Sequence, residues 1–343
     1  MINALSTELI LRKNEIDENI DTVYFGGGTP SLLDIDDLKY LLDIINKNYH
    51  VSDNMEVTIE ANPDDLSEKK IIELSKSPIN RLSIGIQSFF DDDLKMMNRA
   101  HSSEEAERSL SLATSYFDNI TIDLIYGLIN MSSDKWRQNL QKAFYFGVPH
   151  ISSYALTVES RTALDNFIKT GKYPPLDEKL ASKHFDILVD ETSKNGFVQY
   201  EISNFGKPNY FSKHNTSYWK GHSYLGIGPS AHSYNGSQRS WNIANNARYL
   251  KSIHNNELPL QTETLSQNDK INEYIMTGLR TIWGVSLNRI EKEFGKEHKI
   301  KLLRNAQNHL TNNSLEIINE VLLVTKRGQF FTDGIASDLF FVH

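Results

Sequence analysis

The chain of 343 residues is long enough to bury a large core, as one big domain or two. It is 39% hydrophobic and 23% charged, contains no apolar run near the ~18 residues of a membrane span, and has a net charge of −8, which predicts a soluble protein and argues against nucleic-acid binding. It has no cysteine, which excludes disulfides, cysteine nucleophiles, thiolate zinc sites and any iron–sulfur cluster held by thiolates of this chain.

The first predicted element is a charged amphipathic helix over residues 1–20, with Leu5, Leu9, Ile10 and Ile16 on its apolar face. The same residues do not form a secretory signal, so we expect a cytoplasmic location.

A short strand and a glycine turn follow in TVYFGGGTPSLL, residues 22–33. Gly26, Gly27 and Gly28 allow positive φ angles and bring backbone N–H and C=O groups close to a ligand. Asp34 is placed to cap an amphipathic helix over residues 36–49. The segment predicts a ligand loop, and the alternative is a tight strand-to-helix turn without a ligand.

Strands and helices then alternate up to residue 156, with five strands in total. The strands are predicted at 22–25, 55–61, 80–86, 119–125 and 150–156, and the helices at 67–77, 91–99, 103–117 and 133–146. This order predicts an α/β fold with a parallel sheet covered by helices, whose ligands bind at the carboxyl ends of the strands.

Three of the predicted strands carry polar side chains near their ends. Glu60 closes one strand, Gln87 closes the next, and Asp123 lies inside ITIDLIYGL. A carboxylate late in an apolar strand needs a partner or a ligand. Each of these side chains alone could cap a helix or bond a loop amide, but three at one rim favour a binding site.

The second half of the chain is less regular. Residues 161–196 predict helices broken at Tyr173, Pro174 and Pro175, and residues 197–241 are rich in glycine and aromatic residues, with HNTSYW at 214–219 and LGIGPSAHSY at 225–234. A helix is predicted at 243–255, and a polar stretch at 259–266 predicts a domain boundary. The rest predicts two helices, a third over 302–310 and a hairpin of 315–318 with 321–325, an order similar to a winged-helix module. Its ten Lys and Arg against nine Asp and Glu favour a packing or lid role over DNA reading.

Eight segments in order give the chain its resemblance to a family. They are GGGTPS, IEANPDDLS, RLSIGIQSF, MMNRAH, IDLIYGL, ISSYALTVE, HNTSYW and GIGPSAHS. The chain resembles the HemW-type haem chaperones, radical-SAM relatives of oxygen-independent coproporphyrinogen III oxidase (HemN-like). The resemblance implies a partial (β/α)6 TIM-like barrel over 1–160, its completion with the HNxxYW region over 161–260, and a C-terminal winged-helix-like domain over 261–343.

The resemblance also implies a site for S-adenosylmethionine. The residues that match are Gly27, Gly28, Thr29, Glu60, Gln87, Arg99, Asp123 and Ala155. The glycine loop would meet the methionine end of the cofactor, and the carboxylates would attract its ammonium and sulfonium charges. Arg99 would pair with its carboxylate, and Ala155 would offer backbone contacts to the adenine.

The chain departs from the family in one respect. The CxxxCxxC motif that holds the [4Fe–4S] cluster is absent, as is the strand before the first helix, so one βα unit of about 30 residues is missing at the front. We interpret the chain as an N-terminally truncated member and assign no catalytic residue, because reductive cleavage of S-adenosylmethionine requires the cluster. Binding of S-adenosylmethionine is expected to be weak without the iron that chelates it.

The haem function rests on other residues. The resemblance makes His214 the ligand of the haem iron, with Tyr218 and Trp219 stacking on the porphyrin, and the expected partners are haem and haem-accepting proteins. His222 and His232 are second ligands or hydrogen-bonded loop histidines. A coproporphyrinogen III oxidase-like enzyme of porphyrin biosynthesis and an inactive partner-binding remnant are the alternatives. The sequence leaves peripheral membrane contact and a homodimer open.

Overall fold

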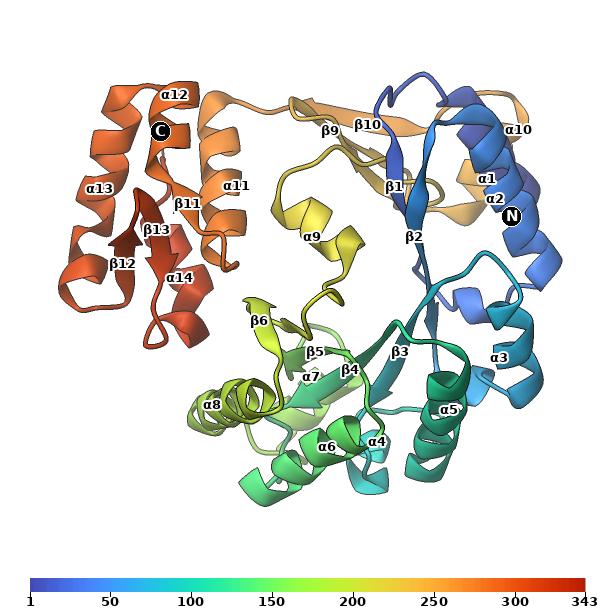
Figure 1. Ribbon diagram of the computed structural model, residues 1–343, viewed down its shortest axis with the longest axis horizontal. Coiled ribbons are helices and arrows are strands. Elements are labelled where there is room, and N and C mark those ends of the chain that lie inside the picture. The colour runs from blue at the N-terminus through green and yellow to red at the C-terminus, as the bar shows by residue number, and fades with distance from the viewer. Residues whose placement is uncertain (343) are drawn as a thin grey trace. The chain divides into compact units, whose positions relative to one another are not determined.

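The computed structural model describes residues 1–342, and Figure 1 labels its helices and strands. The chain forms two compact units, each made of segments that are separate in sequence. The first unit contains Met1–Thr22, Asp34–Met55 and the chain from Lys213 onward; the second contains Val23–Leu33 and Glu56–Ser212. No helix within residues 1–342 is both long and apolar enough to cross a bilayer.

A seven-stranded sheet with the order β1-β2-β3-β4-β5-β7-β6 is the largest element (Figure 1). Its strands are β1 (Ile20–Phe25), β2 (Val51–Ala61), β3 (Arg81–Gln87), β4 (Ile120–Tyr126), β5 (His150–Ala155), β6 (Val198–Glu201) and β7 (Asn204–Gly206). Strands β2 to β5 pair in parallel, while β7 pairs antiparallel with both β5 and β6. The five strands predicted up to residue 156 and the α/β class are confirmed; β6 and β7 were not predicted.

The helices of the second unit follow the strands as the alternation predicts. They are α3 (Glu68–Ser75), α4 (Asp91–Met96), α5 (Ser103–Tyr116), α6 (Ser133–Tyr145), α7 (Ala163–Lys169) and α8 (Glu178–Lys194). A capping box of Ser102 and Glu105 starts α5, and the side chain of Ser132 caps α6. Helix α4 ends at Met96, three residues before its predicted end at Arg99, because the backbone turns at Asn98 with a positive φ of 55°.

The two faces of the sheet differ in polarity, as the period of two in a strand requires. The fully buried apolar positions of β3 and β4 are Leu82, Ile84, Ile86, Ile120, Ile122 and Leu124. The positions between them are Ser83, Gly85, Gln87, Thr121 and Asp123. Helices α6 and α8 contact β4 (Figure 1) and bury their own apolar side chains, so the polar positions are left for the opposite face.

The first unit begins with α1 (Ile2–Leu11) and α2 (Ile35–Asn48). The predicted first helix was too long, because Ile16 is the only half-buried residue between Lys13 and Asn19 and little burial supports further turns. Asp34 does occupy the cap position of α2, but its side chain makes no cap hydrogen bond.

A buried carboxylate on α1 ties distant parts of the first unit together. The Glu8 carboxylate accepts hydrogen bonds from the backbone N–H of Gly228 at 2.8 Å, from Asn242 Nδ2 at 2.6 Å and from the Tyr249 hydroxyl at 2.6 Å. Arg12 pairs with Glu8 at 3.1 Å and donates to the carbonyl of Gly226 at 2.8 Å. These bonds hold the GIGPSAHS segment in place. The sequence predicted that this segment matters, but not that Glu8 and Arg12 bind it.

The remaining elements of this part are α9 (Lys213–Trp219), α10 (Asn246–His254) and a three-stranded antiparallel sheet of β8 (His232–Tyr234), β9 (Gln238–Asn242) and β10 (Leu260–Thr264). Strand β10 lies inside the polar stretch 259–266, where the sequence showed no period. It pairs with β9 through Gln261 opposite Trp241, and four of its five side chains are exposed, so an edge strand formed without an apolar signal. The domain boundary placed there stays a prediction.

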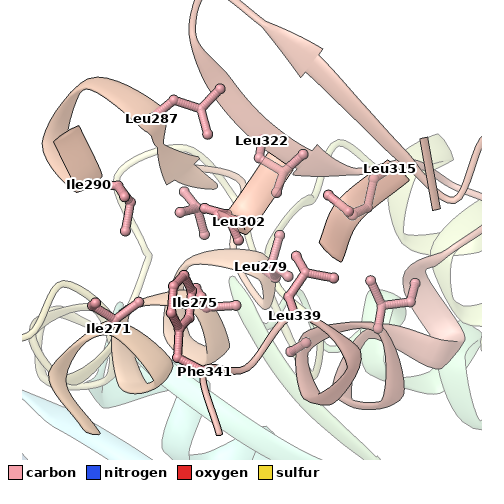
Figure 2. Close-up of a cluster of buried hydrophobic side chains, with 14 residues drawn as sticks. Ile271, Ile275, Leu279, Leu287, Ile290, Leu302, Leu315, Leu322, Leu339 and Phe341 are labelled. Atoms are coloured by element: carbon pink, nitrogen blue, oxygen red, sulfur yellow. The ribbon is translucent and has the colours of Figure 1, made fainter. Parts of the chain in front are cut away.

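The C-terminal segment contains α11 (Gln267–Leu279), β11 (Val285–Ser286), α12 (Leu287–Phe294), α13 (Lys296–Thr311), β12 (Leu315–Ile318), β13 (Val321–Val324) and α14 (Thr332–Asp338). The predicted order of helices and the hairpin are confirmed, although α13 begins earlier than expected. Figure 2 shows its own apolar core, in which Ile275, Leu302 and Leu322 are fully buried. The packing of α11, α13 and the hairpin around this core stabilises the C-terminal segment.

Candidate functional site

The glycine turn after β1 presents open backbone. Gly27 and Gly28 have φ angles of 79° and 71°, and a Cβ built on either would meet no atom within 4 Å. A side chain at these positions would be strained by the backbone rather than by crowding. Gly26 is required for a different reason: a side chain there would clash, because its Cβ would lie 2.6 Å from the Tyr24 ring. Thr29 follows as the residue before a short 3₁₀ turn, Pro30–Leu32.

Glu60, near the end of β2, is bound to this turn. Its carboxylate accepts hydrogen bonds from the Tyr24 hydroxyl at 2.8 Å and from the backbone N–H of Gly27 at 3.1 Å. Burial and the negative charge of Glu60 raise the pKa of Tyr24, so the phenol stays protonated and donates. The glycine turn and the end of β2 therefore form one hydrogen-bonded unit.

Asp123 on β4 belongs to the same charged group. Burial, and after it the Glu60 carboxylate, raise the pKa of Asp123, while a hydrogen bond with Ser152 and the positive charges of Arg99 and Arg81 lower it. The net result is a pKa of about 7. A carboxyl group that titrates near neutrality is typical of a binding site. It would release its proton when a cationic ligand arrives.

Gln87 reaches this face in an unusual way. Its φ is 65°, and its Nε2 lies 2.9 Å from the point where a Cβ of Gly85 would stand. The side chain therefore lies back over the strand, in space that Gly85 leaves open. The sequence showed Gly85 within RLSIGIQSF, but the need for a glycine there was visible only in the structure.

The eight residues predicted to bind S-adenosylmethionine all lie in the second unit. Glu60 joins Gly27 by a hydrogen bond, and Glu60, Asp123 and Arg99 interact electrostatically. Ala155 ends β5 opposite Tyr126, beyond Ser152. In residues 1–342, no hydrogen bond or ion pair joins Thr29 or Ala155 to these three charged groups.

Sequence reasoning missed several polar residues of this face. Tyr24 binds Glu60, Ser152 lies opposite Asp123 and donates to Asn204 at 2.8 Å, and Arg81 donates to Asn119 and Thr121. Burial lowers the pKa of the Arg81 guanidinium, which nevertheless remains a cation. A polar residue at every second position of an apolar strand was the available signal.

The HNTSYW segment forms α9 in the first unit. His214 is half-buried, its Nδ1 lies 2.9 Å from the Thr22 hydroxyl, and its ring meets that of Tyr218 edge to face at 4.8 Å. Burial lowers the pKa of His214 to about 4, so the imidazole is neutral at pH 7. A neutral imidazole is the form that ligates a metal.

An aromatic row leads from α9 to the small sheet. The ring of Tyr218 lies 4.5 Å from that of Tyr224, which lies 6.0 Å from that of Tyr234. Tyr218 is 39% exposed, and burial of the rest raises its pKa to about 12. His222 and His232 are both exposed, and the ring of His232 stacks on Trp241 at 5.9 Å.

The residues present fit two of the three groups that the resemblance implies. The cluster does not fit, because the chain has no cysteine and no group of three or more His, Asp or Glu in residues 1–342 could hold a metal ion. S-adenosylmethionine fits the open glycine turn and its two carboxylates. An iron porphyrin fits the neutral His214 and the aromatic rings beside it.

Comparison with known proteins agrees with this fold. Residues 2–143 match the Radical SAM superfamily, and residues 265–331 match the HemN C-terminal domain. The "Heme chaperone HemW" of Bacillus subtilis is 34% identical over 301 residues, covering 86% of this chain and 79% of the relative. That of Lactococcus lactis is 36% identical over 278 residues, covering 81% and 73%.

Among solved structures, coproporphyrinogen III oxidase (HemN) from Escherichia coli, described as a radical SAM enzyme, superposes with a TM-score of 0.84 at 19% identity. The match covers 99% of this chain and 82% of that one. It confirms the predicted partial barrel with a small C-terminal domain. At this identity, the likeness concerns the fold alone.

Proposed function

We propose, on the premise that this chain belongs to the HemW family of haem chaperones, that it binds haem through His214 and passes it to haem-accepting proteins. The observation that carries the proposal is the state of His214: a half-buried, neutral imidazole whose Nδ1 lies 2.9 Å from the Thr22 hydroxyl. Haem is the cargo in this proposal, not a resident cofactor.

The environment of His214 suits an axial ligand. A contact at Nδ1 orients the ring and selects its tautomer, and iron would be ligated through Nε2. Because burial holds the pKa near 4, protons do not compete with iron at neutral pH. Tyr218 and Trp219, four and five residues further on the same helix, supply flat rings for the porphyrin.

We propose a second, weaker ligand for the barrel face. Glu60, Asp123, Gln87 and Arg99, with the turn of Gly27, Gly28 and Thr29 and the backbone of Ala155, would hold S-adenosylmethionine. When bound beside a reduced cluster, this cofactor supplies a carbon radical, but the chain lacks the thiolates for that cluster. Its residues would bind and orient the cofactor and shield it from water, without any radical step.

The two alternative functions are less well supported by the residues of this chain. A coproporphyrinogen oxidase-like activity requires the cluster, and so the absence of cysteine disfavours it. A partner-binding remnant would need no cofactor, and would leave the neutral His214 without a role. Neither alternative has an observation of its own in its favour.

Haem titration tests the proposal. We expect the purified chain to shift the Soret band of added haem, and the His214→Ala variant to lose the shift, with affinity falling at least tenfold. His254→Ala, an exposed histidine in the last turn of α10, is the matched control and should bind as the parent does. Equal binding by the parent and His214→Ala would refute the assignment, and no shift in any of the three would leave the remnant interpretation.

A further inference from the structure

The carboxyl end of α9 carries two cations that the proposed function does not use. The Arg280 guanidinium carbon lies 5.2 Å from the centre of the Trp219 ring, and Lys220 Nζ lies 4.7 Å from the centre of the Trp283 ring. Each pair joins a residue at the end of α9 to a residue just after α11, within the segment that matches the HemN C-terminal domain. Two cations and two indole rings are therefore gathered next to the HNTSYW segment.

Arg280 already binds a carboxylate. Its Nη1 lies 2.5 Å from Asp333 Oδ1, with the Arg280 side chain 18% exposed and that of Asp333 63% exposed. The guanidinium is therefore already oriented to donate hydrogen bonds to a carboxylate, at the boundary with solvent. Because the Asp333 carboxylate is mostly exposed to water, its pairing with Arg280 contributes little free energy, and another carboxylate can replace it at small cost.

We propose that Arg280 and Lys220 bind the two propionate carboxylates of the porphyrin whose iron His214 ligates, and that Asp333 occupies Arg280 until the porphyrin arrives. This inference rests on the proposed haem function. It assigns the C-terminal domain a part in recognising the cargo, in addition to packing.

The charges and the spacing support this assignment. The chain has a net charge of −8 and would repel a dianionic ligand, so local cations are needed at the edge of the binding surface. Arg280 would form a bidentate pair with one carboxylate, and Lys220 would act as a point charge for the other. His214 and Trp219 are five residues apart on one helix, about 7.5 Å along its axis, so both cations lie at the end of α9 beyond the imidazole.

The test compares haem with haem dimethyl ester, which keeps the iron and the ring but has no propionate charge. We expect the parent chain to bind haem about tenfold more tightly than the ester, measured by Soret titration in one buffer. Arg280→Gln should lose that preference by binding haem about tenfold more weakly and the ester unchanged. Lys220→Gln should show a smaller loss of the same kind, and Asp333→Asn should bind haem several-fold more tightly.

A second ion pair in the same domain provides the controls. Arg289 and Glu293 on α12 lie 2.9 Å apart with similar exposure, 46% and 44%, and Arg289→Gln and Glu293→Gln should change neither affinity. Unchanged ester binding shows that Arg280→Gln is folded. Equal affinity of the parent for haem and ester, or equal weakening of both ligands by Arg280→Gln, would overturn the propionate assignment while the role of His214 stands. If His214→Ala bound both haem and the ester as tightly as the parent does, the proposed function itself would be overturned.

Discussion

The two candidate sites of this chain are built from opposite kinds of side chain. The barrel face gathers Glu60 and Asp123, where burial and the charge of Glu60 raise the pKa of Asp123, with Arg99 as a partial counter-charge. Helix α9 gathers a neutral imidazole and aromatic rings, and its cations lie at its end. The absence of cysteine removes the anchor of the first site, while the haem site that we propose at the second needs no thiolate.

The largest expected consequence is a difference in affinity between the two ligands. We expect haem to bind at least about 100-fold more tightly than S-adenosylmethionine, because aromatic contacts and iron ligation remain while the chelating iron is missing. Isothermal titration calorimetry for S-adenosylmethionine and Soret titration for haem give the two constants. Tight binding of S-adenosylmethionine would break the comparison, since the carboxylates and the glycine turn would then suffice alone.

The next prediction concerns the pH dependence of the charged site. The pKa of Asp123 is raised to about 7 in the folded chain, so the folded state holds a proton that the unfolded state releases near pH 4. The contribution of Asp123 to the free energy of unfolding is therefore full below pH 4 and is lost as the pH rises through 7. Asp123→Asn has no carboxyl group to titrate at this position. Between pH 5 and pH 8, its free energy of unfolding should therefore rise by roughly 1 to 3 kcal/mol relative to that of the parent.

Urea denaturation at both pH values measures this gain. Asp186→Asn, an exposed aspartate on α8, is the matched control and should follow the parent at both. A constant difference between Asp123→Asn and the parent would mean that Asp123 does not titrate between pH 5 and pH 8, which would contradict a pKa of about 7.

The smallest effect is expected at Thr22. Its hydroxyl orients His214 without touching the cargo, so Thr22→Val, which keeps the shape, should weaken haem binding about threefold to tenfold. The Soret maximum should stay in place if ligation by His214 is retained. Thr29→Val is the control in the glycine turn and should leave haem affinity unchanged; a loss at both positions would point to folding instead of ring orientation.

Local pattern in the sequence determined much of this protein. Alternating strands and helices predicted the parallel α/β sheet, and the GGG segment predicted a turn after the first strand, because both are encoded by neighbouring residues or a short period. The resemblance of eight segments implied the partial barrel, whereas helix α9 at HNTSYW was not predicted. The absence of cysteine was decisive without any structure.

Tertiary structure decided the rest, because it depends on residues far apart in the chain. The titration of Asp123 needs Glu60 and Arg99 nearby, the place of Gln87 needs the missing side chain of Gly85, and the GIGPSAHS segment needs Glu8 from α1. The contact of Arg280 with Trp219 joins residues 61 positions apart, 280 less 219. No period or motif carries that information, since burial, charge and distance arise only when the elements pack.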